Sequence, residues 1–544
     1  MRDGRVRLLV AMGVVLFGAS VARAADVIPA RVAEGAKARV DAHLYPALVV
    51  AVVDDGKTEV AGYGALPDGK APGADTIFEI GSVTKTFTAT LLADAVISGR
   101  VTLDEPLAKL LPDFTIPSRD GKSITLAESG TQHSGLPRMP ANFAPADPSD
   151  PYADYDAARL KAFLADYELP RDPGASYEYS NLAFGLLGYA LAHSADTDYP
   201  TLLHDRVLAP LGMASTGTTL TGAMRAHLAP PHDEAGKLGH TWRFDVLAGC
   251  GAIKSDATDM LRYLRANMGA LKTPLADAMK LAHTPRADMG ETQRIGLAWM
   301  THPGPGGGIV WHNGMTGGYA SFVGFTADSK RGVVVLTNAA VSVDDLGMSA
   351  LDPDAPLAAA HPTIAMSHAQ LDAYAGTYEI AQGFDLRIFR AEQQLYGQAT
   401  GQQGFALYPS ADDEFVARLA PIGITFERDA DGKVTGLVLH QNGDHPARRK
   451  ADAPSIALDA AALQDYVGQY QLAPGAIFDI TTQGDQLYAQ LTGQPSFPVF
   501  ASAKDRFFYK VVDAQIDFVR GEDGKVEALV LHQNGKDLRA PRTK

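Results

Sequence analysis

The sequence has little of what marks several common protein classes. Only one cysteine, Cys250, occurs among the 544 residues, so no intramolecular disulfide can form and domain size must supply the stability. Positive charge is also in deficit, with 48 Lys and Arg against 63 Asp and Glu and a net charge of −15. That sign does not suit a phosphate backbone or an anionic membrane, so we expect no nucleic-acid partner.

Long apolar runs are absent beyond the N-terminus. After residue 24 no segment has the roughly 18 uninterrupted apolar residues that a transmembrane helix needs. The first 24 residues have the pattern of a signal peptide, in which three arginines precede the apolar stretch Leu8 to Ala19 and Ala22-Arg23-Ala24 forms a small-x-small cleavage site. We expect cleavage after Ala24 and a periplasmic or secreted protein without a stable membrane anchor.

Several catalytic motifs are missing from the sequence as well. It has no Gly-x-Ser-x-Gly elbow, no His-Glu-x-x-His and no Cys or His cluster with zinc spacing, so we expect neither a metal nor a cofactor. The segment Gly64 to Lys70 imitates a phosphate loop, but Ala71 stands where a magnesium-binding Ser or Thr would be. Cys250 has no positive residue close in sequence, so a buried thiol is expected there rather than a nucleophile.

The C-terminal third contains an internal repeat. The heptapeptide Leu437 to Gly443 recurs unchanged 92 residues later, and other matches keep the same offset without a gap. Within each copy, short alternating runs are separated by Gly, Asp and Pro turns, which predicts antiparallel strands. We therefore predict two tandem small antiparallel β-barrels, at 369–452 and 461–544, because closure removes exposed sheet edges. His440 and His532 repeat with the fold, so a structural role is expected for both.

Residues 25–355 form a larger unit of the α+β class. Strand patterns lie near both of its ends, whereas the middle, from about Ser82 to Met268, has helical patterns and Pro-rich loops. The strands are expected at residues 47–53, 58–63, 308–312, 319–326 and 332–337. We predict that the N-terminal hairpin pairs with the late strands, and that the site is a cleft between this sheet and the helices.

A serine and a lysine stand three residues apart where a helix is expected to begin. Gly81 ends a strand, and Ser82 opens a helical pattern that runs to about Ser98. At this spacing Ser82 and Lys85 share one helix face, so the amine can reach the hydroxyl and take its proton. A helix N-terminus also directs backbone N–H groups at a developing oxyanion. The structural alternative is that Ser82 only caps the helix.

Two later segments carry further polar groups. Tyr179 and Asn181 come just before the apolar helical pattern Leu182 to Ala192, which places a phenol and a carboxamide together at a helix start. Asn181 as a helix cap is the structural alternative. His312 ends a predicted strand and is followed by a glycine-rich turn, which would let a substrate backbone approach the strand edge. A lone histidine at such a place is usually structural.

Taken together, these segments resemble the serine β-lactamase and penicillin-binding-protein superfamily, and in particular its class C-like branch, peptidase family S12. The resemblance covers about residues 30–340 and rests on the phrases Phe78 to Phe87, Thr131 to Pro137, Tyr179 to Asn181 and His312 to Gly314. It implies a β-lactamase-like fold, with an antiparallel sheet, helices and a helical subdomain. It also implies that Ser82 is the nucleophile, Lys85 its hydrogen-bonded base and Tyr179 the second proton carrier.

The resemblance extends to the residues that would bind substrate. Asn181 would hold the substrate amide. The oxyanion hole would be the backbone N–H groups of Ser82 and Met315, the residue after Gly314. His312 departs from the family pattern, because it stands where β-lactamases and most penicillin-binding proteins have the lysine of Lys-Thr-Gly. That lysine helps to bind a substrate carboxylate, so a histidine weakens the case for penicillin-type substrates.

Branches with His-Xaa-Gly are similar to D-aminopeptidases and D-Ala-D-Ala peptidases, and some of them carry C-terminal barrels. We therefore expect an exported serine peptidase that acts on short peptides, often beside D-residues, with the barrels at the entrance to the cleft. An esterase or a weak β-lactamase would use the same acyl-transfer chemistry. A catalytically silent domain that binds cell-wall peptides is the alternative from another class.

Overall fold

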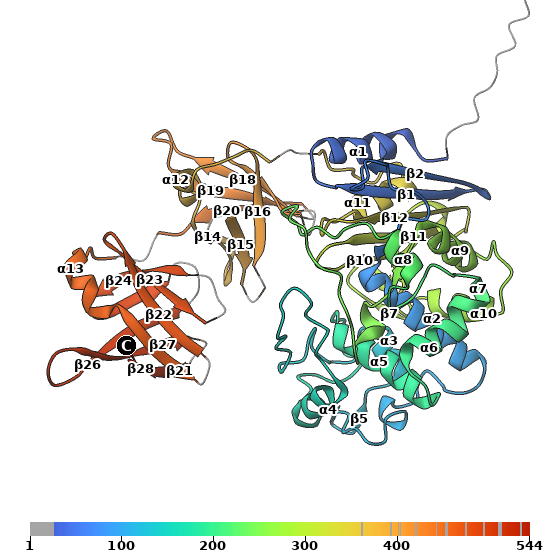
Figure 1. Cartoon of the computed structure of the whole chain (residues 1–544), viewed down its shortest axis with the longest axis horizontal. Coiled ribbons are helices and arrows are strands. Elements are labelled where there is room, and N and C mark those ends of the chain that lie inside the picture. The colour runs from blue at the N-terminus through green and yellow to red at the C-terminus, as the bar shows by residue number, and fades with distance from the viewer. Residues whose placement is uncertain are drawn as a thin grey trace, which may run out of the picture.

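The computed structural model describes residues 27–543 apart from residues 361–362, 392–393, 401, 403, 419–421, 442, 452–454, 474–475, 493–495, 510–513 and 534–535. The predicted signal peptide, residues 1–24, lies outside the described residues. A large unit of helices and sheet is followed by two antiparallel β units (Figure 1), which confirms the predicted fold class. No helix in the described part of the chain is long and apolar enough to cross a membrane.

The main sheet has eight strands in the order β2-β1-β12-β11-β10-β9-β8-β7. Their bounds are β1 (Ala47–Asp54), β2 (Lys57–Gly64), β7 (Ala287–Asp288), β8 (Arg294–Ile295), β9 (Met300–His302), β10 (Ile309–Met315), β11 (Ala320–Thr326) and β12 (Arg331–Thr337). β1 pairs antiparallel with β12, with Leu48 opposite Thr337. The predicted pairing between the N-terminal hairpin and the late strands is therefore confirmed.

Helices cover both faces of this sheet, because β1 is apolar on both sides. Leu48, Val50 and Val52 belong to one core, whereas Val49 and Val53 belong to another on the opposite face. The helices of this unit are α1 (Ala30–Asp41), α2 (Thr84–Ile97), α3 (Leu126–Gly130), α4 (Ala157–Asp166), α5 (Asn181–Ser194), α6 (Tyr199–Leu203), α7 (Ala209–Leu211), α8 (Gly222–Ala226), α9 (Ala257–Asn267), α10 (Ala276–His283) and α11 (Asp344–Leu351). Helices α1 and α11 pack on the first face.

Helix α2 lies inside the large unit and is buried on every side from Thr84 to Ala95. Its threonine hydroxyls satisfy their hydrogen bonds within the core. Thr88 Oγ1 lies 2.7 Å from the hydroxyl of Tyr199, and the hydroxyl of Tyr263 donates to Thr86 Oγ1 over 3.0 Å. A helix held in this way gives a rigid support to the residues at its N-terminus.

The first β unit is a closed barrel of strands β13 to β20 and begins after the short helix α12 (His368–Asp372). Its strands are β13 (Gly376–Ala381), β14 (Phe384–Ala391), β15 (Gln394–Ala399), β16 (Phe405–Ala411), β17 (Glu414–Val416), β18 (Gly423–Arg428), β19 (Val434–His440) and β20 (Asp444–Arg449). β13 pairs with β20 through Tyr378 and Glu379, which closes the barrel.

The second β unit repeats this topology after helix α13 (Ala460–Leu463). Its strands are β21 (Gly468–Ala473), β22 (Ala476–Gln483), β23 (Gln486–Leu491), β24 (Phe497–Ala503), β25 (Arg506–Tyr509), β26 (Ala514–Arg520), β27 (Val526–Gln533) and β28 (Lys536–Pro541). Here β21 meets the end of the chain through the isolated bridge between Tyr470 and Arg542, so the barrel is nearly closed. The core repeats too: Tyr374 and Phe426 lie 4.6 Å apart between ring centres, and Tyr466 and Phe518 lie 4.7 Å apart.

The first barrel lies against the large unit, whereas the second lies beyond the first (Figure 1). The backbone amide of Ser342 donates to the carbonyl of Arg418 over 2.9 Å, and the guanidinium of Arg418 donates to the carbonyl of Glu234 over 2.6 Å. The two barrels touch through Phe389 and Phe497, whose ring centres lie 6.3 Å apart.

Candidate active site

The site forms where the short 3₁₀ turn Gly81–Val83, which precedes α2, meets strand β10. The two backbones approach so closely that a side chain would not fit at either contact. A Cβ on Gly81, which has φ +48°, would lie 2.6 Å from Met315 N, and a Cβ on Gly314 would lie 2.0 Å from Ile80 O and 2.9 Å from Ser82 N. Glycine at both positions therefore lets the turn and the strand approach, so that the backbone N–H groups of Ser82 and Met315 lie close together.

Strand β10 has a free edge at this point. Its partner on one side, β9, pairs with only the first three residues of β10, Ile309 to Trp311. On the other side Thr316 N donates to Tyr319 O at the turn into β11. Because hydrogen-bonded and non-hydrogen-bonded pairs alternate in an antiparallel ladder, the N–H of Met315 points away from β11. It therefore faces the side of β10 on which Ser82 lies.

Ser82, Lys85 and Tyr179 meet at one oxygen atom. Ser82 Oγ accepts a hydrogen bond from Lys85 Nζ over 2.9 Å and another from the hydroxyl of Tyr179 over 2.6 Å. The Ser82 side chain caps no helix, so the structural alternative considered for it is wrong. A serine oxygen with an amine and a phenol both within hydrogen-bond distance has the geometry of an activated nucleophile.

Lys85 is fully buried, and all three of its N–H donors are used. Besides Ser82 Oγ, it donates to Asn181 Oδ1 over 2.8 Å and to the backbone carbonyl of Cys250 over 2.7 Å. None of these three acceptors carries a charge. The contact with the Cys250 carbonyl could not be predicted from the sequence, because a backbone carbonyl has no residue signature. The Cys250 thiol is buried as expected, and burial raises its pKa.

Asn181 is oriented by the lysine and is not the helix cap. Ser180 caps α5, since its hydroxyl accepts from Ala183 N over 2.9 Å. The side chain of Asn181 is thereby available to the site. Its Oδ1 accepts from Lys85, and its Nδ2 donates to the hydroxyl of Tyr152 over 3.0 Å. The cap interpretation of Asn181 is therefore wrong.

His312 is buried and is not among the described residues that line the pocket. Its side chain is 2% exposed, and its Nδ1 lies 2.6 Å from the carbonyl oxygen of Asn313. Burial, together with the nearby Lys85, lowers the pKa of His312 to about 3. The imidazole is therefore neutral at physiological pH and supplies no positive charge in place of the family lysine.

The pocket in front of Ser82 has a volume of about 440 Å³. Of the predicted residues it contains Ser82, Tyr179, Asn181, Gly314 and Met315. Sequence reasoning missed several others in its wall, among them Arg138, Tyr152, Trp242, Phe244, Asn313, Ser342 and Asp344. Arg138 directly follows the family phrase Thr131 to Pro137, so a closer reading of that segment could have found it.

Asp344, which was not predicted from the sequence as a site residue, hydrogen-bonds to strand β10 in the wall of the pocket. Asn313 Nδ2 donates to Asp344 Oδ2 over 2.7 Å, which ties β10 to the start of α11. Burial raises the pKa of Asp344 to about 6. This hydrogen bond at the start of α11 lies two residues after Ser342, whose backbone amide contacts Arg418 of the first barrel.

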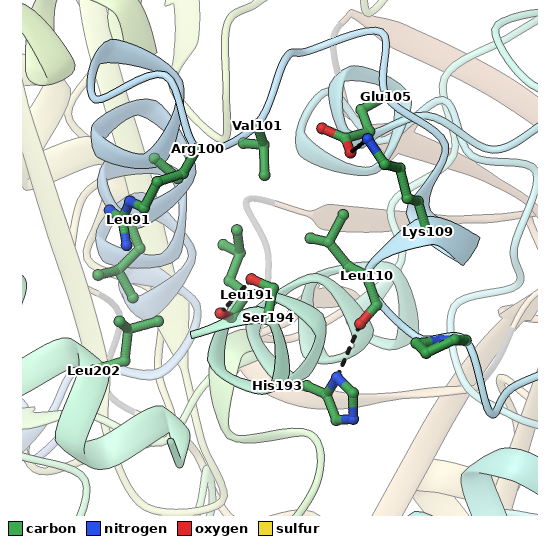
Figure 2. A pocket seen from close by; sticks show the side chains of 12 residues that line it. Leu91, Arg100, Val101, Glu105, Lys109, Leu110, Leu191, His193, Ser194 and Leu202 are labelled. Atoms are coloured by element: carbon green, nitrogen blue, oxygen red, sulfur yellow. Dashed lines mark hydrogen bonds and ion pairs between the residues drawn. The ribbon is translucent and has the colours of Figure 1, made fainter. Parts of the chain in front are cut away.

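Another hollow, of about 520 Å³, lies between α2, α5 and the segment after α2 (Figure 2). Lys109 forms an ion pair with Glu105 over 2.6 Å there, and Arg100 pairs with Asp94 over 2.7 Å. Ser194 Oγ donates to the carbonyl of Leu191, without a lysine or tyrosine beside it. This hollow therefore lacks an activated nucleophile and a free cation.

Comparison with known proteins agrees with this geometry. Residues 32–355 match the Beta-lactamase family model, and residues 360–450 and 452–542 each match a domain of unknown function (DUF3471). A β-lactamase of Pseudomonas fluorescens is 29% identical over 325 residues, which is 54% of this chain and 88% of that protein. The D-alanyl-D-alanine-carboxypeptidase/endopeptidase AmpH of Escherichia coli (strain K12) is 27% identical over 306 residues, 53% of this chain and 78% of AmpH.

The solved structures give the same result. A class C β-lactamase from Rhodobacter sphaeroides is 25% identical, with a TM-score of 0.50 over 57% of this chain and 93% of that chain. The chain therefore belongs to the β-lactamase family, in the class C-like branch of the serine β-lactamase and penicillin-binding-protein superfamily, and is a serine hydrolase.

Proposed function

We propose that the protein is an exported serine peptidase that hydrolyses amide bonds of short linear peptides, including peptides with D-residues, through an acyl-enzyme at Ser82. The observation that carries the proposal is the double hydrogen bond to Ser82 Oγ from Lys85 and Tyr179 at an open pocket. Export follows from the signal-peptide pattern of residues 1–24.

The chemistry proceeds in two halves. When Lys85 is a neutral amine it accepts the Ser82 proton, and Oγ attacks the substrate carbonyl carbon. The N–H groups of Ser82 and Met315 stabilise the oxyanion, the C–N bond breaks, and Tyr179 gives its proton to the leaving amine. Lys85 then passes the proton taken from Ser82 to Tyr179, so that both side chains return to their starting forms. Water then attacks the acyl ester, the same side chains carry its proton to Oγ, and Ser82 is regenerated.

The free edge of β10 supports a peptide as the substrate. An extended chain can lie along this edge as an additional strand, with its scissile carbonyl at the two N–H groups. His312 adds to this argument, because a neutral, buried imidazole gives no cation at the place of the lysine that helps to bind penicillin-type substrates. The relative AmpH is named as a D-alanyl-D-alanine-carboxypeptidase/endopeptidase, which also supports a peptide substrate.

An esterase or a weak β-lactamase would use the same atoms and remains the alternative within enzymes. A silent peptide-binding domain is disfavoured, because burial of a lysine without a charged partner is costly and a pure binder gains nothing from it.

A substrate panel tests the proposal. It contains D- and L-aminoacyl anilides, D-Ala-D-Ala peptides, linear mixed-chirality peptides, nitrophenyl esters and a chromogenic cephalosporin, with Ser82→Ala as the control. We expect kcat/KM to be highest for a short peptide and to vanish in Ser82→Ala. A preference for the cephalosporin or for esters alone would contradict the peptidase assignment. N-terminal sequencing of the exported protein should begin at Ala25.

A further inference from the structure

The active-site pocket contains one cation that the proposed mechanism does not use. Arg138 is exposed and lines the same pocket as Ser82. Its guanidinium carbon lies 5.1 Å from the centre of the Tyr179 ring, which is a cation–π distance. Its carbonyl accepts the backbone amide of Asn181 over 3.0 Å, so the main chain of Arg138 is fixed at the start of α5.

No carboxylate of the described residues forms an ion pair with Arg138. Other arginines near the site do have acidic partners: Arg171 pairs with Glu178, and Arg243 pairs with Asp150 over 2.6 Å. The carboxyl group in the pocket wall, Asp344, accepts from Asn313. Arg138 therefore presents its guanidinium to the pocket with its charge uncompensated. A guanidinium has a planar set of donors that matches the two oxygens of a carboxylate.

The other basic groups of the site cannot take this role. Lys85 is buried and has its three donors on Ser82, Asn181 and the Cys250 carbonyl. His312 is 2% exposed and is not part of the pocket wall. Arg138 is thus the basic side chain in the described wall that is open to a substrate anion.

We propose that Arg138 is a specificity-determining residue that binds a carboxylate of the substrate, so that the enzyme selects anionic peptides. The inference rests on the proposed peptidase function and names its substrate class. The guanidinium lies 5.1 Å from the centre of the Tyr179 ring, and the hydroxyl of that tyrosine reaches Ser82 over 2.6 Å. At roughly 3.3 Å per residue, the carboxylate lies within about three residues of the scissile bond. It comes from the peptide C-terminus or from an acidic side chain.

Binding to Ser82→Ala tests this without turnover. The first peptide pair differs only at the C-terminus, as a free acid or an amide of a D-Ala-D-Ala peptide. The second pair carries D-Glu or D-Gln two residues before the scissile bond, with an amidated C-terminus. Calorimetry should give a Kd about tenfold or more lower for the anion in at least one pair. The pair with the preference identifies the source of the carboxylate.

The variants are made in the same Ser82→Ala background. Arg138→Met should reduce the preference to within about twofold, and Arg138→Glu should invert it to favour the neutral peptide. Arg294→Met is the matched control, because it also removes one arginine charge but lies on β8, half-exposed and paired with Asp288. It should keep the full preference. Equal melting temperatures would show that all three variants are folded.

The inference is overturned if Arg138→Met keeps the preference, if the parent protein shows none, or if no anionic peptide binds. These outcomes are separate from the fate of the peptidase proposal. A wild-type enzyme that cleaves none of the peptides, while Arg138-dependent binding of the anions persists, would end the peptidase proposal and support this inference.

Discussion

The backbone amide of Ser342 donates a hydrogen bond to the carbonyl oxygen of Arg418 over 2.9 Å, across the boundary between the hydrolase unit and the first barrel. Ser342 belongs to the wall of the active-site pocket. Two residues later, Asp344 holds Asn313 of β10. The barrel is thus joined directly to a segment that shapes the site, and a neighbouring domain at a cleft can exclude bulky substrates by steric contact.

Removal of the barrels should therefore change selectivity more than chemistry. A chain that ends after about residue 360 loses Arg418 and its contact with Ser342, but keeps Ser82, Lys85 and Tyr179. We expect it to react with a small ester and to prefer a different peptide length or terminus. The peptide panel, run on both proteins, measures this. A folded truncated protein with the selectivity of the full chain would show that the barrels serve something outside the active site.

Loss of either proton-transfer group should slow acylation without unfolding the protein. Tyr179→Phe removes the hydroxyl that lies 2.6 Å from Ser82 Oγ, and Lys85→Met replaces the buried amine with an apolar chain of similar length. Each should lower the acylation rate by about 100-fold or more, as is typical of lost proton transfer. Stopped-flow ester acylation and a melting curve test both parts. Wild-type acylation rates would remove these residues from the mechanism.

The contact between the large unit and the first barrel should depend on pH through Glu234. Burial raises the pKa of Glu234 to about 7, from an ordinary value of 4.5. A carboxyl whose pKa is higher in the folded state binds its proton more tightly there, so its contribution to stability is present at low pH and is lost as the pH rises from about 4.5 through 7. The melting temperature of the wild type should therefore fall more between pH 5 and pH 7 than that of Glu234→Gln. Parallel curves would contradict this account.

We expect no metal requirement, because Lys85 and Tyr179 carry the proton transfers and the backbone N–H groups bind the oxyanion. Exhaustive treatment with a chelator should leave peptide hydrolysis at its original rate. Loss of activity that returns on addition of a divalent cation would mean that the serine mechanism is wrong or incomplete.

The features of the fold and of the site that could be predicted from the sequence are those with a pattern among neighbouring residues or a repeat. Ser82 and Lys85 lie one helical turn apart in the sequence. The 92-residue repeat predicts two similar barrels. The main strands β1, β11 and β12 are largely apolar runs of seven or eight residues, a length and composition that predict buried strands. By contrast, the strands β7 and β8 have only two residues each, which is too short for any periodicity.

The missed parts of the site depend on the tertiary fold. The acceptor from Cys250 is a backbone carbonyl, and the contact between Asp344 and Asn313 joins residues 31 positions apart. The cap of α5 was ambiguous because Ser180 and Asn181 are adjacent and both are good caps. Only the folded chain shows which of the two side chains turns into the site.

Covalent labelling of Ser82 is the most direct test of the central claim, which is that this serine forms the acyl-enzyme. A fluorophosphonate probe followed by peptide mass mapping should place a single modification on Ser82, and Ser82→Ala should lose both the label and peptide turnover. Because the Ser82 side chain caps no helix, the alanine variant should melt close to the wild type. A label on another serine, or wild-type turnover by a folded Ser82→Ala protein, would contradict the account.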